Sequence, residues 1–544
     1  MEPIWRKSWP PHVPDHVDPD SIGSLVNIIE EAFGQYGDKP AYHNQGTTLS
    51  YSEVDGMSRN FAAFLQARPH LEKGARIALM CPNILPFPLA MYGNLRAGLI
   101  QVNVNPLYTA RELKHQLNDA DVDSIIIIET ALPTLLEVLD EVPVRTIIVI
   151  GENDLLGETD DVILPNLSGY DVHTFQGALN ASEALPVRKI ELGGGDLAFL
   201  QYTGGTTGLA KGAMLSHRNV ITNVLAFTAF LGDDVFGVDR PVIITATPMY
   251  HILGLAANTL SFLHKGGLNI LIHNPRDMPG FVEELGKWPF TVITGVNTLF
   301  NGLLHTPGFD KVDFSSLKLA MGGGTPIQEA ISNHWHTVTG KHIKEGYGLS
   351  ETGGVTQTPL YVEGFRSTIG LPFPSLEVSL RDDEGNEAGI NEPGEICFRG
   401  PTVMRGYWGR EDLNDTIFTG DGFFRTGDIA TVEEDGFFHI VDRKKDMILV
   451  SGFNVYPTEV EEVGMSAPGV FECACIGVPD ERTGEAVKLF VVPKQNADVS
   501  VDEIREYCRR NLAAYKVPKY VECIDTLPKS AVGKILRKDL RSEE

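Results

Sequence analysis

Short apolar runs alternate with stretches of helical periodicity along most of the chain. The apolar runs have the length of buried strands, and they lie at residues 75–80, 100–104, 124–128, 146–150, 197–200, 241–246, 267–272, 290–295 and 317–321. Strands that alternate with helices form parallel sheets whose faces are covered by those helices. The pattern therefore predicts an α/β fold with parallel-rich sheets.

Helices are predicted between and before these runs. An amphipathic helix is expected at residues 24–33, and a strand followed by a capped helix begins at residues 48–54 and runs toward Gln66. Another helix, with proline near its start, is expected to end at Ala97, and residues 132–139 are interpreted as a helix between two strands. Residues 151–195 are polar and irregular, so they are interpreted as a connecting excursion.

The pattern changes beyond Ile369. Shorter strands alternate there with turns rich in Gly, Asn and Asp. We expect a large N-terminal domain, residues 1–441, in which the part from about residue 370 to residue 441 is a small β-barrel-like subdomain. A charge cluster at residues 442–446 forms a linker, and residues 447–544, with helices at 457–465 and 501–512, form a small α+β domain.

Charge and cysteine content narrow the class of protein. The 544 residues include 72 acidic and 45 basic side chains, a net charge of −27, which argues against nucleic-acid binding because that function usually requires a basic surface. The six cysteines include no C-x-x-C pair, so neither a zinc site nor a disulfide framework is predicted. Reduced cysteines fit a cytoplasmic protein.

Membrane-spanning and secretory segments are not expected. No uncharged apolar run reaches the length of a spanning helix, and the first residues lack the apolar region of a secretory signal. Peripheral association with a membrane and formation of a homodimer are left open.

A glycine- and threonine-rich stretch, YTGGTTGLAKG at residues 202–212, follows the apolar run at 197–200. Glycine lets the backbone approach a ligand, and free N–H groups, threonine hydroxyls and the Lys211 ammonium can donate to an anion. The stretch is not a Walker A loop. In that motif the lysine directly follows a glycine, whereas Leu209 and Ala210 separate Gly208 from Lys211 here. The alternative is a flexible surface loop, but threonine is a poor choice for flexibility alone, so polyphosphate binding is favoured.

Three further motifs carry groups suited to a nucleotide. GYGLSE at residues 346–351 can present Tyr347 to a purine ring, and Glu351 suits Mg²⁺, which prefers few carboxylates plus substrate phosphates. In RTGD, Asp428 follows a tight turn and can accept hydrogen bonds from both ribose hydroxyls. Lys534 follows a glycine on a predicted loop. Taken alone, these motifs have ordinary alternatives: a turn before a capped helix, a solvated aspartate and a surface lysine.

Together the motifs resemble the signatures of the acyl-adenylate-forming enzymes, which include acyl- and aryl-CoA ligases, luciferases and peptide-synthetase adenylation domains. The phosphate loop has Gly204 where serine is frequent and Ala210 where proline is frequent, but its backbone N–H groups remain. The resemblance runs from about Ser24 to Arg537. It is strongest to bacterial long-chain fatty-acyl-CoA synthetases, through residues 102–108, 293–300 and above all 441–457.

The resemblance implies a role for each motif. The residues expected to bind ATP or AMP are Thr203, Gly204, Gly205, Thr206, Thr207, Gly208, Lys211, Gly323, Gly324, Thr325, Gly346, Tyr347, Gly348, Asp428 and Arg443. Tyr347 would stack on adenine, Asp428 and Arg443 would contact the ribose, and Glu351 with Thr206 would hold Mg²⁺.

The residues with implied catalytic roles are Lys534, Glu351, His251 and Thr206. Lys534 would be a mobile lysine that reaches the carboxylate and the α-phosphate, where a positioned cation stabilises the charge that adenylation develops.

The resemblance also implies an acyl pocket and a moving C-terminal domain. The residues expected to line the pocket are Tyr250, His251, Val296 and Gly322. His251 would lie close to the reacting carboxyl; plain core packing and a structural histidine are the alternatives. Lys445 would be the hinge, within residues 442–446, about which a mobile C-terminal domain rotates, and Gly452 would help to form the CoA channel.

The implied activity is ATP-dependent conversion of a medium- to long-chain fatty acid to its acyl-CoA thioester. The fatty carboxylate attacks the α-phosphorus of ATP to give acyl-AMP and pyrophosphate, and the CoA thiol then displaces AMP. A cytoplasmic enzyme is expected. Peripheral contact with the inner face of the plasma membrane stays open, because fatty acids partition into bilayers and a peripheral enzyme could collect them there.

Other functions stay open at this point. They are a ligase for aryl or other carboxylates, an adenylation enzyme that loads a carrier protein, and a luciferase-like oxygenase. No carrier-like segment follows Arg541 in this chain, although a separate carrier could serve. A nucleotide sensor without activity would keep the ATP motifs and lose Lys534, so the presence of this lysine argues against it.

Overall fold

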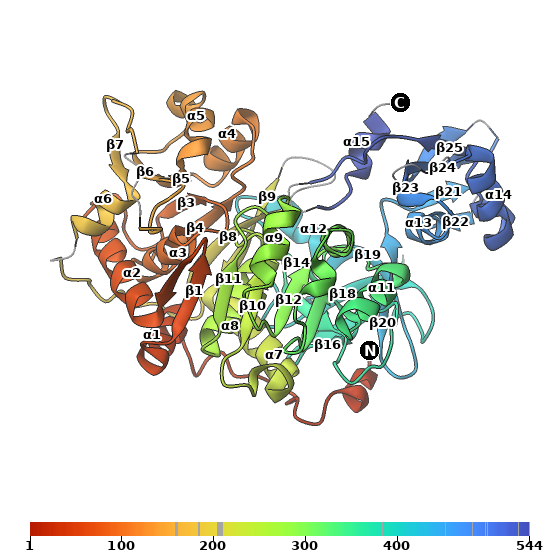
Figure 1. The fold of residues 1–544 in the computed structure, drawn as a ribbon, viewed down its shortest axis with the longest axis horizontal. Coiled ribbons are helices and arrows are strands. Elements are labelled where there is room, and N and C mark those ends of the chain that lie inside the picture. Colours follow the sequence, from red (N-terminus) through yellow and green to blue (C-terminus); the bar gives the residue numbers. More distant parts are fainter. Residues whose placement is uncertain are drawn as a thin grey trace.

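Two large mixed sheets lie side by side in the computed structural model, and a smaller unit that contains the last residues lies apart at the upper right (Figure 1). The structure describes residues 1–157, 162–182, 185–203, 210–382, 384–451, 453–480, 482–494, 497, 499–530 and 533–542. The expected α/β class, with parallel-rich sheets in a large N-terminal part, is confirmed.

The first sheet has seven strands. Their order is β7 (Asp171–Thr174), β6 (Thr146–Ile150), β5 (Ser124–Ile128), β3 (Arg76–Met80), β4 (Ile100–Val104), β8 (Leu197–Thr203) and β9 (Lys211–Ser216). All neighbours run parallel except β8 and β9. Strands β4, β5 and β6 are buried along their whole length, as expected for parallel strands with both faces covered.

Four of the α-helices described in this part were predicted, one of them over a longer range, whereas those at Ala110–Asp119 and Phe175–Asn180 were not. The α-helices of this part are α1 (Leu25–Tyr36), α2 (Tyr51–Gln66), α3 (Pro86–Arg96), α4 (Ala110–Asp119), α5 (Leu132–Leu136) and α6 (Phe175–Asn180). The start of α2 is fixed by a capping box, in which Ser50 accepts from the N–H of Glu53 and the Glu53 carboxylate accepts from the N–H of Ser50. The helix expected at residues 132–139 ends at Leu136, before a 3₁₀ turn at Leu139–Glu141.

The second sheet has nine strands. Their order is β16 (Leu371–Pro372), β15 (Gly353–Gln357), β14 (Ile343–Leu349), β13 (Leu319–Gly322), β12 (Val292–Gly295), β10 (Val242–Thr245), β11 (Leu268–Leu271), β1 (Pro40–Asn44) and β2 (Thr47–Ser50). The strands from β14 to β1 are parallel, and both edges are antiparallel. The helices of this part are α7 (His217–Phe236), a π-helix (Leu253–Leu260), α8 (Ser261–His264), α9 (Met278–Leu285), α10 (Asn297–Leu304) and α11 (Glu329–Thr339).

An antiparallel four-stranded sheet follows. It consists of β17 (Glu377–Arg381), β18 (Gly394–Arg399), β19 (Phe424–Val432) and β20 (Phe438–Arg443), with α12 (Glu411–Ile417) between β18 and β19. The N-terminal 3₁₀ segment Ile4–Ser8 packs on this sheet through Trp5, whose ring centroid lies 5.8 Å from that of Phe438.

The C-terminal unit is an α+β structure. It contains β21 (Ile448–Val450), β22 (Phe453–Val455), α13 (Pro457–Met465), β23 (Val470–Asp480), β24 (Gly484–Pro493), α14 (Val501–Asn511), β25 (Tyr520–Cys523) and α15 (Arg537–Ser542). Cys473 and Cys475 lie two residues apart on β23, both buried. The exact domain boundaries and the role of residues 442–446 as a hinge stay predictions.

The expected excursion at residues 151–195 is partly wrong. Strand β7 pairs in parallel with β6 at the edge of the first sheet, and α6 follows it directly. The strand was missed because its sequence, DVHT, contains no apolar run. It is an edge strand whose residues are exposed or half-buried, so it needs fewer apolar side chains than a central strand.

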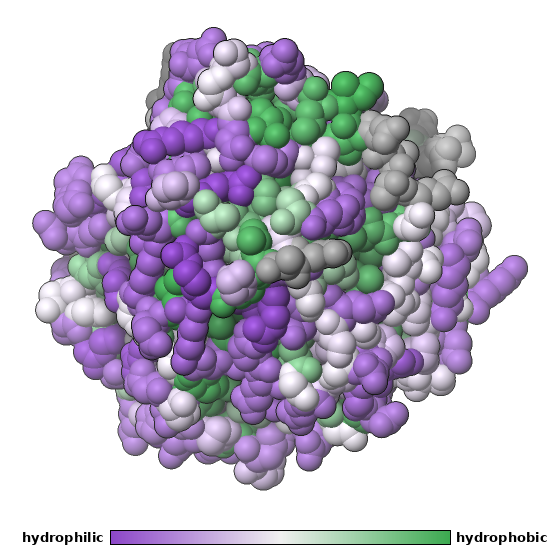
Figure 2. Space-filling model, turned by 90° about the vertical axis from the view of Figure 1, so that its left-hand side faces the viewer, coloured by the Kyte–Doolittle hydropathy of each residue, from purple (hydrophilic) through white to green (hydrophobic). Residues whose placement is uncertain are grey.

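One face of the molecule can be described by the hydropathy of its side chains (Figure 2). The face on the side of β7 and α6 is mainly hydrophilic, with hydrophobic side chains in separate groups (Figure 2). Among the described residues, no helix combines the length and the hydropathy needed to cross a bilayer. Peripheral membrane contact and a homodimer stay predictions.

The tail that carries Lys534 is tied to its own unit by Arg537. The Arg537 guanidinium forms two hydrogen bonds to the Glu461 carboxylate of α13, at 3.0 and 2.7 Å, and lies 3.6 Å from Asp446 and 3.8 Å from Asp442. Burial nevertheless keeps the pKa of both Glu461 and Asp442 above its usual value. These carboxylates therefore depend on Arg537 for compensation.

We expect Arg537→Met to lower the free energy of unfolding of the C-terminal unit by about 3 kcal/mol, because it leaves the buried Glu461 carboxylate without its partner. Urea denaturation followed by circular dichroism would measure the loss. The matched control is Arg541→Met. Arg541 is more exposed and pairs with Asp446 at 3.0 Å, so its loss should be about 1 kcal/mol or less. Equal losses in the two variants would contradict this account.

Candidate active site

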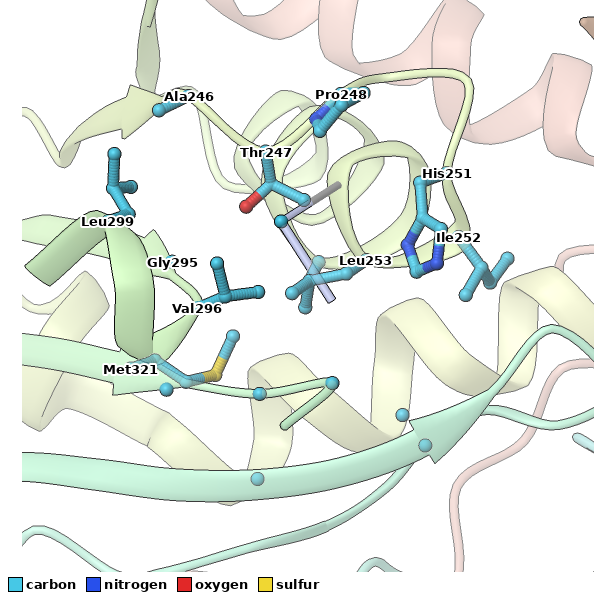
Figure 3. A pocket seen from close by; sticks show the side chains of 18 of the residues that line it. Ala246, Thr247, Pro248, His251, Ile252, Leu253, Gly295, Val296, Leu299 and Met321 are labelled. Carbon is cyan, nitrogen blue, oxygen red and sulfur yellow. The ribbon is translucent and has the colours of Figure 1, made fainter. Parts of the chain in front are cut away.

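A cavity of about 360 Å³ opens where several parallel strands of the second sheet end. Its wall includes Thr247 after β10, Gly295 at the end of β12, Gly322 at the end of β13 and Gly346 within β14. Ligands of open parallel sheets bind at the carboxyl ends of the strands, so this is the expected place for a substrate. Side chains of three of these segments surround the cavity, with Thr247, His251, Val296 and Met321 facing it (Figure 3).

One part of the wall is apolar. It is formed by Phe227 of α7, by Leu253 and Ala257 of the π-helix, and by Met321 and Phe373. These residues belong to or pack against one core cluster, and the rings of Phe227 and Phe373 meet edge to face at 6.1 Å. This part can accept an aliphatic or aromatic group without unpaired polar atoms.

Another part of the wall comes from the C-terminal tail. Lys529, Ser530 and Lys534 line the cavity, and the Ser530 N–H donates to the Lys534 carbonyl at 2.7 Å. Gly324 makes room for the lysine: it has a φ of +77°, and a Cβ atom there would lie 3.0 Å from Lys534 Cε. The structure therefore brings the glycine loop after β13 and the predicted lysine together.

The pKa of Lys534 is subject to opposing effects from its surroundings. Burial and the nearby Arg443 guanidinium lower the pKa of Lys534 to about 8, while Asp428 and Glu351 act in the opposite direction. A lysine with this pKa is largely protonated at neutral pH and loses its charge in mildly alkaline solution.

His251 is neutral in this environment. Burial, followed by the neighbouring Lys534, lowers the pKa of His251 to about 3. Its Nδ1 atom is buried and has no hydrogen-bond partner among the described residues. The imidazole faces the cavity (Figure 3) and can offer a substrate one donor and one acceptor nitrogen.

Tyr347, Asp428 and Arg443 form a connected group beside the cavity. The Tyr347 hydroxyl donates to Asp428 Oδ2 at 2.5 Å, and Arg443 Nε lies 3.3 Å from Asp428 Oδ1. Asp428 and Arg443 are opposite each other in the β19–β20 pair, which fixes their contact. The predicted adenine and ribose contacts thus lie together, and Gly346, Tyr347 and Gly348 line the cavity itself.

Glu351 contacts a residue that the sequence analysis did not single out. Tyr407 donates its hydroxyl to Glu351 Oε1 at 2.5 Å, and the Lys211 ammonium lies 4.9 Å from the centre of the Tyr407 ring. Lys211 is opposite Thr203 in the β8–β9 pair, so the two ends of the phosphate loop are held together. The loop residues Gly204, Gly205, Thr206, Thr207 and Gly208 lie outside the described residues, as does Gly452.

Glu351 provides a single carboxylate, which agrees with the small number of carboxylates that Mg²⁺ usually binds. Mg²⁺ usually takes one or two carboxylates and fills its remaining positions with water and substrate phosphates. Glu351 supplies one carboxylate, and Oε2 has no hydrogen bond within the described part of the chain. No group of three or more His, Cys, Asp or Glu side chains suited to a metal is found among the described residues, so a bound ion would depend on the substrate for most ligands.

Some predicted residues lie elsewhere. His251, Val296, Gly322, Gly323 and Gly324 line the cavity. Its described lining does not include these predicted residues: Tyr250, Thr325, Thr203, Lys211, Glu351, Asp428 and Arg443. Lys445 is exposed, in the turn between β20 and β21.

The apolar lining residues Phe227, Met321 and Phe373 were missed, because each lies in sequence that is typical of a buried core. Helical spacing on α7 would have placed Phe227 on a buried face but could not have shown that the face borders a cavity.

Comparison with known proteins gives two family matches. A family described as "AMP-binding enzyme" matches residues 29–408, and one described as "AMP-binding enzyme C-terminal domain" matches residues 459–534.

Curated relatives and solved structures match along the chain. A long-chain-fatty-acid–CoA ligase of Yersinia pestis is 48% identical over 556 residues, 100% of this chain and 98% of the relative. One of Bacillus subtilis (strain 168) is 35% identical over 554 residues, 99% of this chain and 98% of the relative.

Among solved structures, ATP-bound MatB from Rhodopseudomonas palustris is 29% identical, with a TM-score of 0.84 over 95% of this chain and 98% of that one. The anthranilate CoA ligase AuaEII with anthranoyl-AMP has a TM-score of 0.86 at 24% identity, covering 97% and 99%, and shows the shared fold. The chain therefore belongs to the AMP-binding enzymes, the acyl-adenylate-forming family that its motifs resemble.

Proposed function

We propose that the chain is an AMP-forming ligase that activates medium- to long-chain fatty acids to acyl-CoA thioesters. The observation that carries the proposal is the 48% identity, along the complete chain, to a protein named long-chain-fatty-acid–CoA ligase. The apolar wall formed by Leu253, Ala257 and Met321 supports it, because each buried CH₂ group of an acyl chain contributes about 0.8 kcal/mol.

The residues around the cavity have separate tasks in this proposal. The carboxylate of the fatty acid lies at the Lys534 ammonium, and the neutral His251 imidazole donates a hydrogen bond to it. The ribose hydroxyls donate to Asp428, which exchanges its contacts with Tyr347 and Arg443 for them. The phosphate loop and Lys211 hold the polyphosphate. Mg²⁺ bound at Glu351 and Thr206 would neutralise phosphate charge.

The reaction proceeds in two steps. A carboxylate oxygen forms a bond to the α-phosphorus while the bond from this phosphorus to the pyrophosphate oxygen breaks, and Lys534 stabilises the negative charge that develops. The CoA thiol then gives its proton to solvent, and its sulfur forms a bond to the acyl carbon while the bond from this carbon to the phosphate oxygen of AMP breaks, so that AMP leaves. We propose that the C-terminal domain, residues 447–544, turns about Lys445 between the steps and that Gly452 borders the entering CoA.

The substrate proposal is tested by ATP- and CoA-dependent release of AMP with a panel of carboxylates: acetate, medium- and long-chain fatty acids, aryl acids and amino acids. We expect AMP release to require CoA and to rise with aliphatic chain length, because a longer chain buries more apolar surface in the cavity. Preference for aryl acids would favour an aryl-CoA ligase, and pyrophosphate release without a need for CoA would favour loading of a carrier protein.

Lys534→Ala separates the two steps. It should lower ATP–pyrophosphate exchange by about 100-fold or more, because it removes the cation that faces the developing charge. Thioester formation from supplied acyl-AMP should stay within about threefold of the unchanged protein. Equal loss in both half-reactions would contradict a role confined to the first step.

The pKa of Lys534 predicts a pH dependence. Since this pKa is lowered to about 8, the cation is present below that pH and is lost as the pH rises through it. For the first half-reaction, kcat/KM, which reports on groups of the free enzyme, should therefore fall above about pH 8. Thioester formation from supplied acyl-AMP should lack this decline. A decline of the same size in both half-reactions would assign it to another group.

A further inference from the structure

Four buried amide side chains form a continuous row of hydrogen bonds toward the active site. Asn94 Nδ2 donates to Gln101 Oε1 at 2.9 Å, and Gln101 Nε2 donates to Asn103 Oδ1 at 2.7 Å. Asn103 Nδ2 donates to Gln201 Oε1 at 2.9 Å, and Gln201 Nε2 donates to the Tyr250 carbonyl at 2.8 Å. The four amide residues are at most 4% exposed, so water does not replace these bonds.

The row crosses the first sheet and ends on the second. Gln101 and Asn103 are two residues apart on β4 and share a face. Asn103 is opposite Gln201 in the parallel β4–β8 pair. Tyr250 belongs to the turn that follows β10 of the other sheet, and it directly precedes His251. The row is therefore a side-chain link between two sheets that share no strand pairing in the part of the chain that the structure describes.

The final acceptor fixes the direction of the whole row. A backbone carbonyl can only accept, so Gln201 must turn its NH₂ group toward Tyr250 and its oxygen toward Asn103. Asn103 must then donate to Gln201 and accept from Gln101, and the same reasoning orients Gln101 toward Asn94. Each amide group therefore has one orientation of its oxygen and nitrogen atoms, and each hydrogen bond polarises the next.

A second buried amide holds the other end of the same turn. Asn83, which follows β3, accepts from the Met249 N–H at 2.8 Å and donates to the carbonyls of Thr245 and Thr247 at 3.0 and 3.1 Å. The turn that carries His251 is thus attached to the first sheet by Asn83 at its start and by Gln201 at its end.

We infer that Gln201 is a positioning residue for the adenylation step, and that it acts by holding the Tyr250 carbonyl and so the place of the His251 imidazole in the cavity. This inference rests on the proposed function, in which His251 contacts the substrate carboxylate. Gln201 itself does not line the cavity within the described residues, so its effect must pass through the turn.

The first experiment compares Gln201→Met with Asn94→Leu. Methionine keeps the length of the side chain but removes both hydrogen bonds, and kcat for ATP–pyrophosphate exchange should fall by roughly 10- to 100-fold, the scale on which small displacements of a reacting group act. Asn94 lies at the far end of the row, away from Tyr250, so its variant should keep kcat within about twofold. Thermal unfolding of both variants measures how much each loses in stability.

The KM for ATP distinguishes an effect of Gln201 on the turn that carries His251 from an effect on the phosphate loop. Gln201 also lies on β8, two residues before the phosphate loop begins. A fall in kcat with little change in KM for ATP supports the inference. A rise in KM for ATP with kcat preserved would show action through the phosphate loop and overturn it. Equal falls in kcat for Gln201→Met and Asn94→Leu, in step with stability, would also overturn it.

A double-mutant cycle with His251→Ala gives the decisive readout. If Gln201 acts through His251, the double variant should be no slower than His251→Ala alone, because the interaction has already been removed. Multiplied losses in the double variant would overturn the inference.

Gln201→Glu keeps the test usable if the methionine variant does not fold. A buried glutamic acid can donate to the Tyr250 carbonyl only in its protonated form, so activity relative to the unchanged protein should rise as the pH falls. A constant ratio across pH would count against the inference.

The test of Gln201 can be separated from the test of the proposed substrate. All variants are assayed with the carboxylate that the unchanged enzyme prefers in the panel. If that carboxylate is not a fatty acid, the substrate proposal fails, while the comparison of kcat values still decides the role of Gln201.

Discussion

The active site depends on the need to satisfy backbone groups at the junction between two sheets. Strand pairing satisfies the N–H and C=O groups within each sheet, but no strand pairs across the junction among the described residues. The turn between β10 and the π-helix lies there, and buried amide side chains of the first sheet supply its missing partners. The fold therefore uses polar side chains in its interior to join two units that apolar packing alone would hold with less definite geometry.

The electrostatics of the site depend on segments outside the first sheet. Lys534 and Arg443 bring two positive charges close together in a partly dehydrated space, and Asp428 and Glu351 oppose them. These four charges sum to zero, and Lys534 is the one of the four in the described lining of the cavity, where its ammonium can meet an anionic substrate. The charges come from β19, β20, the turn after β14 and the C-terminal tail, so the field exists only when these segments are assembled.

The sequence allowed most of the fold to be predicted because its strands are strongly apolar and its helices have clear caps, as at Ser50. Strand β7 escaped prediction because an edge strand needs no apolar run. In the site, the sequence pointed to glycines and to charged or aromatic residues in unusual patterns, and the structure places Gly324, Tyr347 and Lys534 at one cavity. It could not identify Phe373 or Gln201, because an apolar side chain or a single amide has the same local sequence pattern whether it borders a site or fills the core.

The tail that carries Lys534 differs in how firmly it is attached at its two sides. Toward its own unit it has the two hydrogen bonds from Arg537 to Glu461. Toward the cavity wall, the Thr298 hydroxyl reaches the Gly533 carbonyl only at 3.5 Å, the limit of a hydrogen bond. Among the described residues, the tail is thus held more firmly to its own unit than to the cavity wall. Withdrawal of Lys534 from the cavity would return its buried ammonium to water, so the regained hydration would offset the loss of the contacts that the lysine makes there.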